Sequence, residues 1–74
     1  MNPSSEHCRK LASVLSEQAL PPQRLRLDCS VSDEYDFLVA LSTMLEMGWI
    51  KREFPANASA MTYVLTEDGR EKLL

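Results

Sequence analysis

The stretch MLEMGWIKRE, residues 44–53, decides the fold, because it joins the end of a helix to the start of a strand. Its first residues complete an apolar stripe at helical spacing, and Gly48 is the residue type that most often ends a helix. Residues 49–54 then favour a strand, and residues 61–65 favour a returning strand after a loop of small side chains. We therefore predict a β-hairpin directly after a helix.

Both sides of this hairpin carry helix signals. Downstream, Thr66 is suited to cap a short last helix over residues 67–74. Upstream, Ser32 is suited to cap a helix over residues 33–47, and acidic side chains in its first turn compensate the helix dipole. The apolar stripe of this second helix consists of Phe37, Leu38, Leu41, Met44 and Leu45.

The N-terminal third predicts one further helix and then an ambiguous segment. Ser4 or Ser5 can cap a helix that runs to about Gln18, where the Pro21–Pro22 pair stops it. Its apolar positions, at i, i+3, i+4 and i+7, are Cys8, Leu11, Ala12 and Leu15.

Residues 22–31 fit either a helix or a strand. Leu25, Leu27, Cys29 and Val31 alternate with polar residues, which is the period of a half-buried strand. Pro22, however, suits the first position of a short helix, and Leu25 and Cys29 share one helical face. The residues alone leave both interpretations open.

The stretches MLEMGWIKRE (44–53) and TYVLTEDGREKLL (62–74) resemble a winged helix-turn-helix, as in MarR-type regulators and small pilus-operon regulators of the PapI kind. In that family a helix ends at a glycine, a basic strand enters a wing, and the return strand ends in Leu-Thr-x-x-Gly. The resemblance implies an α+β winged helix of three helices, a hairpin and a short C-terminal helix, as a single domain over residues 1–74.

The same resemblance tips residues 22–29 toward helix, as the first helix of the helix-turn-helix, with Val31 and Ser32 in the turn. Two residues depart from the family pattern. Arg26 stands where such helices have a small packed side chain, and Leu27 adds an apolar group on the outer side.

Composition favours a small folded domain. The chain has 74 residues, 45% hydrophobic and 26% charged, as expected of a globular protein. It contains no apolar run near the ~18 residues of a membrane span and does not begin like a secretory signal, so we expect a cytoplasmic protein. Cys8 and Cys29 are expected as buried small side chains, with a disulfide as the alternative; beside His7 they are too few for a zinc site.

The resemblance favours a DNA-binding transcriptional regulator, with residues 33–47 as the recognition helix. Basic side chains on the preceding helix and at the base of the wing are the candidate phosphate contacts: Arg24, Arg26, Lys51 and Arg52. Three observations weaken this hypothesis. The net charge is −3, the wing tip at residues 56–60 is uncharged, and the leading end of the recognition helix is acidic.

The alternative is a winged-helix protein-interaction module, such as a phage-type inhibitor or an adaptor. Its acidic helix would dock on a basic partner surface, including one that otherwise holds nucleic acid. The candidate contacts are the leading residues of the helix and two aromatic side chains expected to be partly exposed: Asp33, Glu34, Tyr35, Asp36 and Phe54. The sequence favours DNA binding only narrowly over this alternative.

Catalysis has little support in the sequence. The chain has one histidine and no Gly-rich phosphate loop, and a domain of this size rarely builds a concave pocket. We therefore expect no enzyme, no cofactor and no metal. A homodimer is possible through the first helix, through Met47 or through the tail at Leu73 and Leu74.

Overall fold

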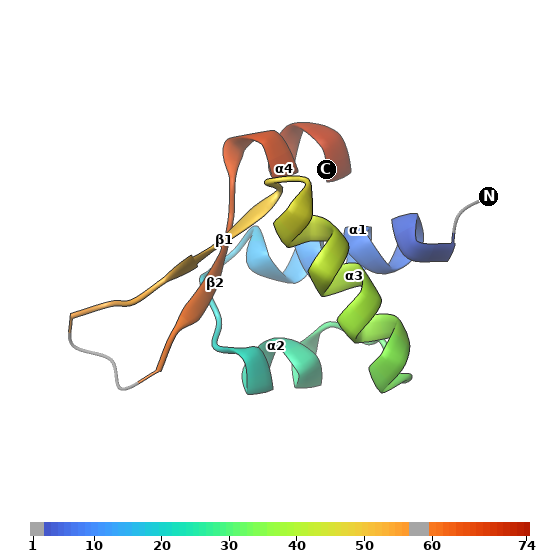
Figure 1. Ribbon diagram of the computed structural model, residues 1–74, viewed down its shortest axis with the longest axis horizontal. Helices are drawn as coiled ribbons and strands as arrows, with labels where there is room; N and C mark the ends of the chain where they lie inside the picture. Colours follow the sequence, from blue (N-terminus) through green and yellow to red (C-terminus); the bar gives the residue numbers. More distant parts are fainter. Residues whose placement is uncertain (1–2, 57–59) are drawn as a thin grey trace.

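The computed structural model describes residues 3–56 and 60–74, with side chains from Glu6 onward in the first helix. Within these residues, four helices and one antiparallel hairpin follow one another along the chain (Figure 1). Their order is α1 (Pro3–Leu15), α2 (Pro22–Asp28), α3 (Glu34–Glu46), β1 (Ile50–Glu53), β2 (Thr62–Leu65) and α4 (Glu67–Leu73). The predicted α+β class and the order of its elements are confirmed.

Helix α1 packs its apolar stripe into the centre of the molecule. The four side chains predicted for this stripe are all buried: Cys8, Leu11, Ala12 and Leu15. The expected boundaries were wrong at both ends, since α1 begins at Pro3, ahead of the two serines, and ends at Leu15. Proline fits the first turn of a helix because it has no N–H to leave unpaired there.

Segment 22–28 is helical, so the strand interpretation is wrong. Pro22 occupies the first helical position, and the amide of Leu25 donates to the carbonyl of Pro21 at 2.9 Å. A half-buried strand would have placed Leu25 and Leu27 on the same face. In the helix, Leu25 is fully buried and Leu27 is 77% exposed.

Helix α3 lies against α1 and contributes four buried side chains to the core: Phe37, Ala40, Leu41 and Met44. Its cap is Asp33 rather than Ser32: the Asp33 carboxylate accepts from the amide of Asp36 at 3.0 Å. Leu38, predicted on the buried stripe, is 52% exposed, whereas Ala40 is buried. Gly48, with φ of 75°, ends the helix as expected, since glycine adopts this left-handed backbone without a steric penalty.

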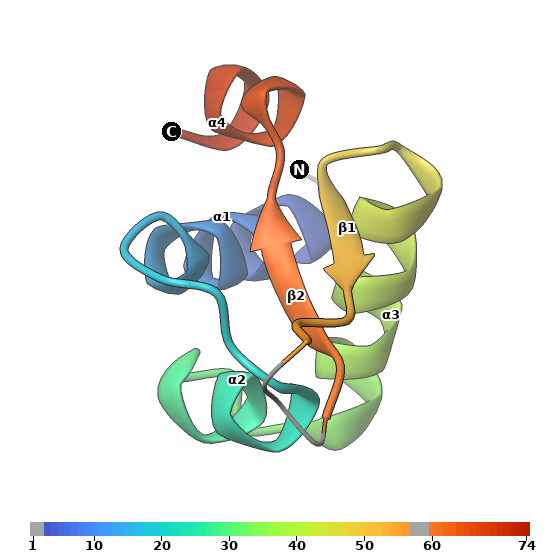
Figure 2. The same ribbon diagram turned by 90° about the vertical axis from the view of Figure 1, so that its left-hand side faces the viewer.

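The hairpin pairs β1 with β2 in the register Ile50↔Leu65 to Glu53↔Thr62. A further antiparallel bridge joins Leu20 to Tyr63, with reciprocal backbone hydrogen bonds of 3.2 and 2.8 Å. This bridge ties the segment between α1 and α2 to the return strand. Figure 2 shows the hairpin crossing in front of α1, with α2 below and α4 above.

Helix α4 closes the base of the hairpin. As predicted, Thr66 is its cap: the hydroxyl accepts from the amide of Gly69 at 3.0 Å and donates to the carbonyl of Gly48 at 2.7 Å. Gly69 is buried, and a Cβ there would lie 2.1 Å from the Trp49 carbonyl oxygen. Trp49 itself is half-buried at the edge of the core.

Candidate functional site

The exposed face of α3 has an unusual composition for a helix expected to read DNA. Residues 34–46 contain acids but no lysine or arginine. The side chains that face solvent are Glu34, Tyr35, Leu38, Ser42 and Glu46. This face therefore offers carboxylates, one aromatic ring and one aliphatic group, and no cationic donor for a phosphate.

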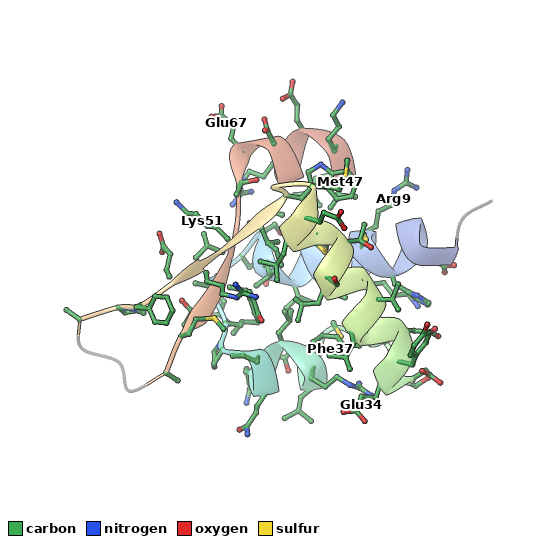
Figure 3. The ribbon with its side chains drawn as sticks, in the orientation of Figure 1. Arg9, Glu34, Phe37, Met47, Lys51 and Glu67 are labelled. Carbon is green, nitrogen blue, oxygen red and sulfur yellow. The ribbon has the colours of Figure 1, made fainter. Side chains whose placement is uncertain are left out.

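The acidic residues at the start of α3 differ in what they contribute. Asp33 has one carboxylate oxygen engaged in the cap hydrogen bond to the Asp36 amide. Glu34 and Asp36 occupy the first turn, where the helix dipole stabilises negative charge. Figure 3 shows Glu34 at the N-terminal end of the helix, away from the core. Its carboxylate is exposed to solvent.

An apolar groove runs between α2 and α3 next to these acids. It has a volume of about 440 Å³ and is open to solvent. Helix α2 contributes Pro22, Gln23, Arg26 and Leu27 to its lining. Helix α3 contributes Glu34, Phe37 and Leu38. Figure 3 shows Phe37 between the two helices, and it is almost completely buried as the floor of this α2–α3 groove.

Arg26 supports the groove from within. Its guanidinium donates from Nη1 to the carbonyl of Val31 and from Nη2 to the carbonyl of Ser32 at 2.9 Å. Its Cζ lies 5.5 Å from the centre of the Phe37 ring, within range of a cation–π interaction. This arginine therefore fixes the loop that leads into α3, where Ser30 has a positive φ of 61°.

The other predicted phosphate contacts lie on α2 and β1, and two of them have carboxylate partners. Arg24 Nε lies 3.1 Å from Asp28 Oδ2, one helical turn away. Lys51 Nζ lies 3.4 Å from Glu53 Oε2 on the same strand. Arg52 is exposed, opposite Tyr63 in the strand register. These pairs reduce the positive charge that either element presents.

The two aromatic candidates are exposed as predicted, Tyr35 at 74% and Phe54 at 78%. They belong to different parts of the molecule, however. Tyr35 is in the first turn of α3, whereas Phe54 directly follows the last residue of β1. Phe54 is therefore not part of the surface formed by Tyr35 and the acids. The uncharged wing tip predicted at residues 56–60 lies partly outside the described residues.

Neither cysteine is placed for reactive chemistry. Cys8 and Cys29 are buried free thiols, as expected, and they donate to the carbonyls of Ala40 and Arg26. Burial raises the pKa of the Cys8 thiol, which disfavours the nucleophilic thiolate. Among the described residues, no three His, Cys, Asp or Glu side chains cluster as metal ligands, and no helix is long and apolar enough to cross a bilayer.

The sequence did not predict the groove itself. Leu27 was noted as an apolar residue on the outer side of its helix, which was the one available signal. Leu38 was assigned to the core, and Pro22, Gln23 and Phe37 gave no sign of lining a surface.

Comparison of the chain with models of protein families, with curated proteins and with solved structures finds no match.

Proposed function

We propose that this chain is a non-enzymatic winged-helix domain that binds another protein through α2 and α3. The order of its elements supports the winged-helix assignment, because three helices, a hairpin and a short closing helix follow one another as the resemblance implies. Two free, buried thiols are expected of a protein that functions in a reducing compartment such as the cytoplasm.

The observation that carries the proposal is the exposed face of α3, which has no basic residue across its whole length. Proteins that bind nucleic acid obtain much of their affinity by placing lysine and arginine against phosphates. Glu34 and Asp36 would meet those phosphates with like charge. Against a basic protein surface the same carboxylates are attractive, and they speed association and exclude wrong partners.

Exposed apolar side chains next to the acids support a protein partner further. Tyr35, Leu38 and Leu27 are each more than half exposed at this end of the molecule. Aromatic and large apolar groups form the centre of protein–protein interfaces, with charged groups at the rim. Phosphate contacts, in contrast, need hydrogen-bond donors.

The test is a capture experiment on a nuclease-treated lysate of the source cells, with two charge-reversed variants that are matched in position. One variant is Glu34→Lys with Asp36→Lys, in the first turn of α3. Its control is Glu67→Lys with Asp68→Lys, in the first turn of α4. Each pair lies beside a capped helix N-terminus, so the two variants lose comparable dipole compensation.

We expect the α3 variant to lose a partner that the wild type and the α4 variant both retain. Thermal unfolding of the two variants establishes that both are folded. Equal capture by both would contradict the proposed face, because the acids of α3 would then be no more important than those of α4.

DNA-binding regulation is the second candidate, and the exposed basic residues Lys51 and Arg52 on β1 favour it. The test is a salt titration of binding to random duplex DNA. A DNA reader shows non-specific binding that weakens steeply as salt rises, and Lys51→Ala with Arg52→Ala would reduce the slope by about two. Absence of binding at low salt would eliminate this candidate.

A further inference from the structure

The shape of the α2–α3 groove favours a macromolecule over a small ligand. Its volume of about 440 Å³ lies within the range of small-molecule sites, ~300–1,000 Å³. Such sites enclose roughly 70–90% of their ligand's surface, however, and this groove is largely open to solvent. A small ligand would remain largely hydrated here, whereas a segment of another protein would cover Leu27 and Leu38 with its own surface.

The backbone on both sides of the groove favours a helical segment. The lining comes from two helices, which pair most of their N–H and C=O groups internally. An extended peptide would find no strand edge there to satisfy its own backbone. A helix brings its backbone hydrogen bonds with it, and its side chains can interdigitate with those of α2 and α3.

The charges around the groove indicate which sign of charge the bound helix carries. Glu34 lines the groove, and Asp33 and Asp36 are its neighbours at the start of α3. Arg26 is the cation in the lining, and its guanidinium is held against two backbone carbonyls. Arg24, outside the lining, is paired with Asp28. Over residues 22–46, which form the two helices and the loop between them, two arginines are outnumbered by five acids, so the surface around the groove is negatively charged.

We propose that the α2–α3 groove binds one face of a basic amphipathic helix of the partner protein. This inference rests on the protein-binding function proposed above. Apolar side chains of the helix, spaced three and four residues apart, lie between Leu27 and Leu38 over Phe37. Lysine or arginine beside them pairs with Glu34 and its acidic neighbours. The partner is thus recognised by an apolar stripe with flanking cations.

The probe is a synthetic peptide of about 14 residues with leucine along one helical face and lysine beside it. A scrambled peptide of the same composition keeps the charge but removes the stripe, and a glutamate-for-lysine version keeps the stripe but reverses the charge. Amide chemical shifts of the isotope-labelled protein locate the binding site, and fluorescence anisotropy gives the affinity.

Matched protein variants distinguish binding in the groove from non-specific binding to exposed apolar side chains. Leu27→Ser with Leu38→Ser removes apolar groups that are 77% and 52% exposed; the control, Phe54→Ser with Met47→Ser, removes groups that are 78% and 56% exposed. We expect affinity for the peptide to fall at least about tenfold in the groove variant and to hold in the control. Glu34→Gln should weaken binding about threefold, and Glu46→Gln should not.

Amide shifts confined to α2 and α3, lost with the scrambled and charge-reversed peptides, would support the inference. Several results would overturn it: binding of the scrambled peptide with equal affinity, shifts elsewhere on the protein, or no binding at millimolar peptide. Shifts on this groove from duplex DNA instead of the peptide would do the same. So would a dimer in sedimentation that the groove variant breaks, because a second copy would then be the occupant.

The capture experiment distinguishes failure of this inference from failure of the proposed protein-binding function. If the groove variant captures the partner as well as wild type while the α3 acid variant does not, the helix-in-groove inference fails and the protein-binding function stands. If the acid variant retains the partner, the proposed function fails whatever the peptide does.

Discussion

At the base of the hairpin, the Thr66 hydroxyl joins Gly48 to Gly69, and the Trp49 carbonyl lies where a side chain of residue 69 would begin. On the opposite side of the molecule, Leu27 and Leu38 extend into solvent on either side of the α2–α3 groove. The first region consists of small or hydrogen-bonding residues that the backbone geometry requires. The second displays large apolar groups that no intramolecular contact requires.

This difference separates the needs of folding from the needs of function. A leucine in a small domain contributes to stability by leaving water, and Leu27 has not left it. Exposed apolar groups that gather beside acids are instead typical of a surface that another protein covers. Substitutions at the hairpin base should therefore reduce stability, and substitutions on the outer rim of the groove should reduce binding.

Gly69→Ala should have the largest effect. In an exposed helix, replacing glycine by alanine stabilises by about 1 kcal/mol. Here the new Cβ would lie 2.1 Å from the Trp49 carbonyl oxygen and 2.7 Å from Leu65 Cδ1, so α4 must move away from the hairpin. We expect the free energy of unfolding to fall by about 3 kcal/mol or more in urea denaturation. The control is Glu71→Ala, at an exposed position of the same helix. A stabilised Gly69→Ala variant would show that α4 is not packed against the hairpin as described.

The pair Leu25→Ala and Leu27→Ala compares the two environments on one helix. Leu25 is fully buried and Leu27 is 77% exposed, so the first truncation leaves a cavity and the second does not. We expect a loss of about 3 kcal/mol for Leu25→Ala and less than about 0.5 kcal/mol for Leu27→Ala, measured by thermal or urea unfolding. Similar losses from both would place Leu27 in the core and remove it from the proposed surface.

Arg26→Met should have a smaller effect on stability, because a flexible apolar side chain keeps part of the packing against Phe37. It loses the hydrogen bonds to the carbonyls of Val31 and Ser32 and the cation–π contact. A loss of about 1 to 2 kcal/mol is expected. Arg24→Met, which breaks an exposed ion pair, should change stability by less than about 0.5 kcal/mol. An equal effect of both would assign Arg26 no special role in the loop before α3.

The sequence predicted the elements well where one residue type has a single physical use. Gly48 marked the end of α3, Thr66 the start of α4, and Pro22 the first position of α2. It predicted less well where two residues could serve one purpose, as with Ser32 and Asp33 before α3. The Leu20–Tyr63 bridge could not be predicted, because the pairing depends on where the chain between α1 and α2 passes the hairpin.

The candidate site was predictable in its charge and not in its shape. The acids at residues 33–36 are visible in the sequence, and so is the lack of bases beside them. The groove depends on the rotation of α2 and α3 about their axes. Helical spacing placed Leu38 on the same stripe as Leu41, but the packing against α1 buries Ala40 and leaves Leu38 half in solvent.

The proposed function requires that the exposed face of α3 meets protein rather than nucleic acid. The most direct test is an amide chemical-shift titration of the isotope-labelled protein with random duplex DNA at low salt, where electrostatic binding is strongest. If this face binds protein, the resonances of residues 33–47 should not move. Shifts concentrated on that helix, and abolished as salt is raised, would contradict it.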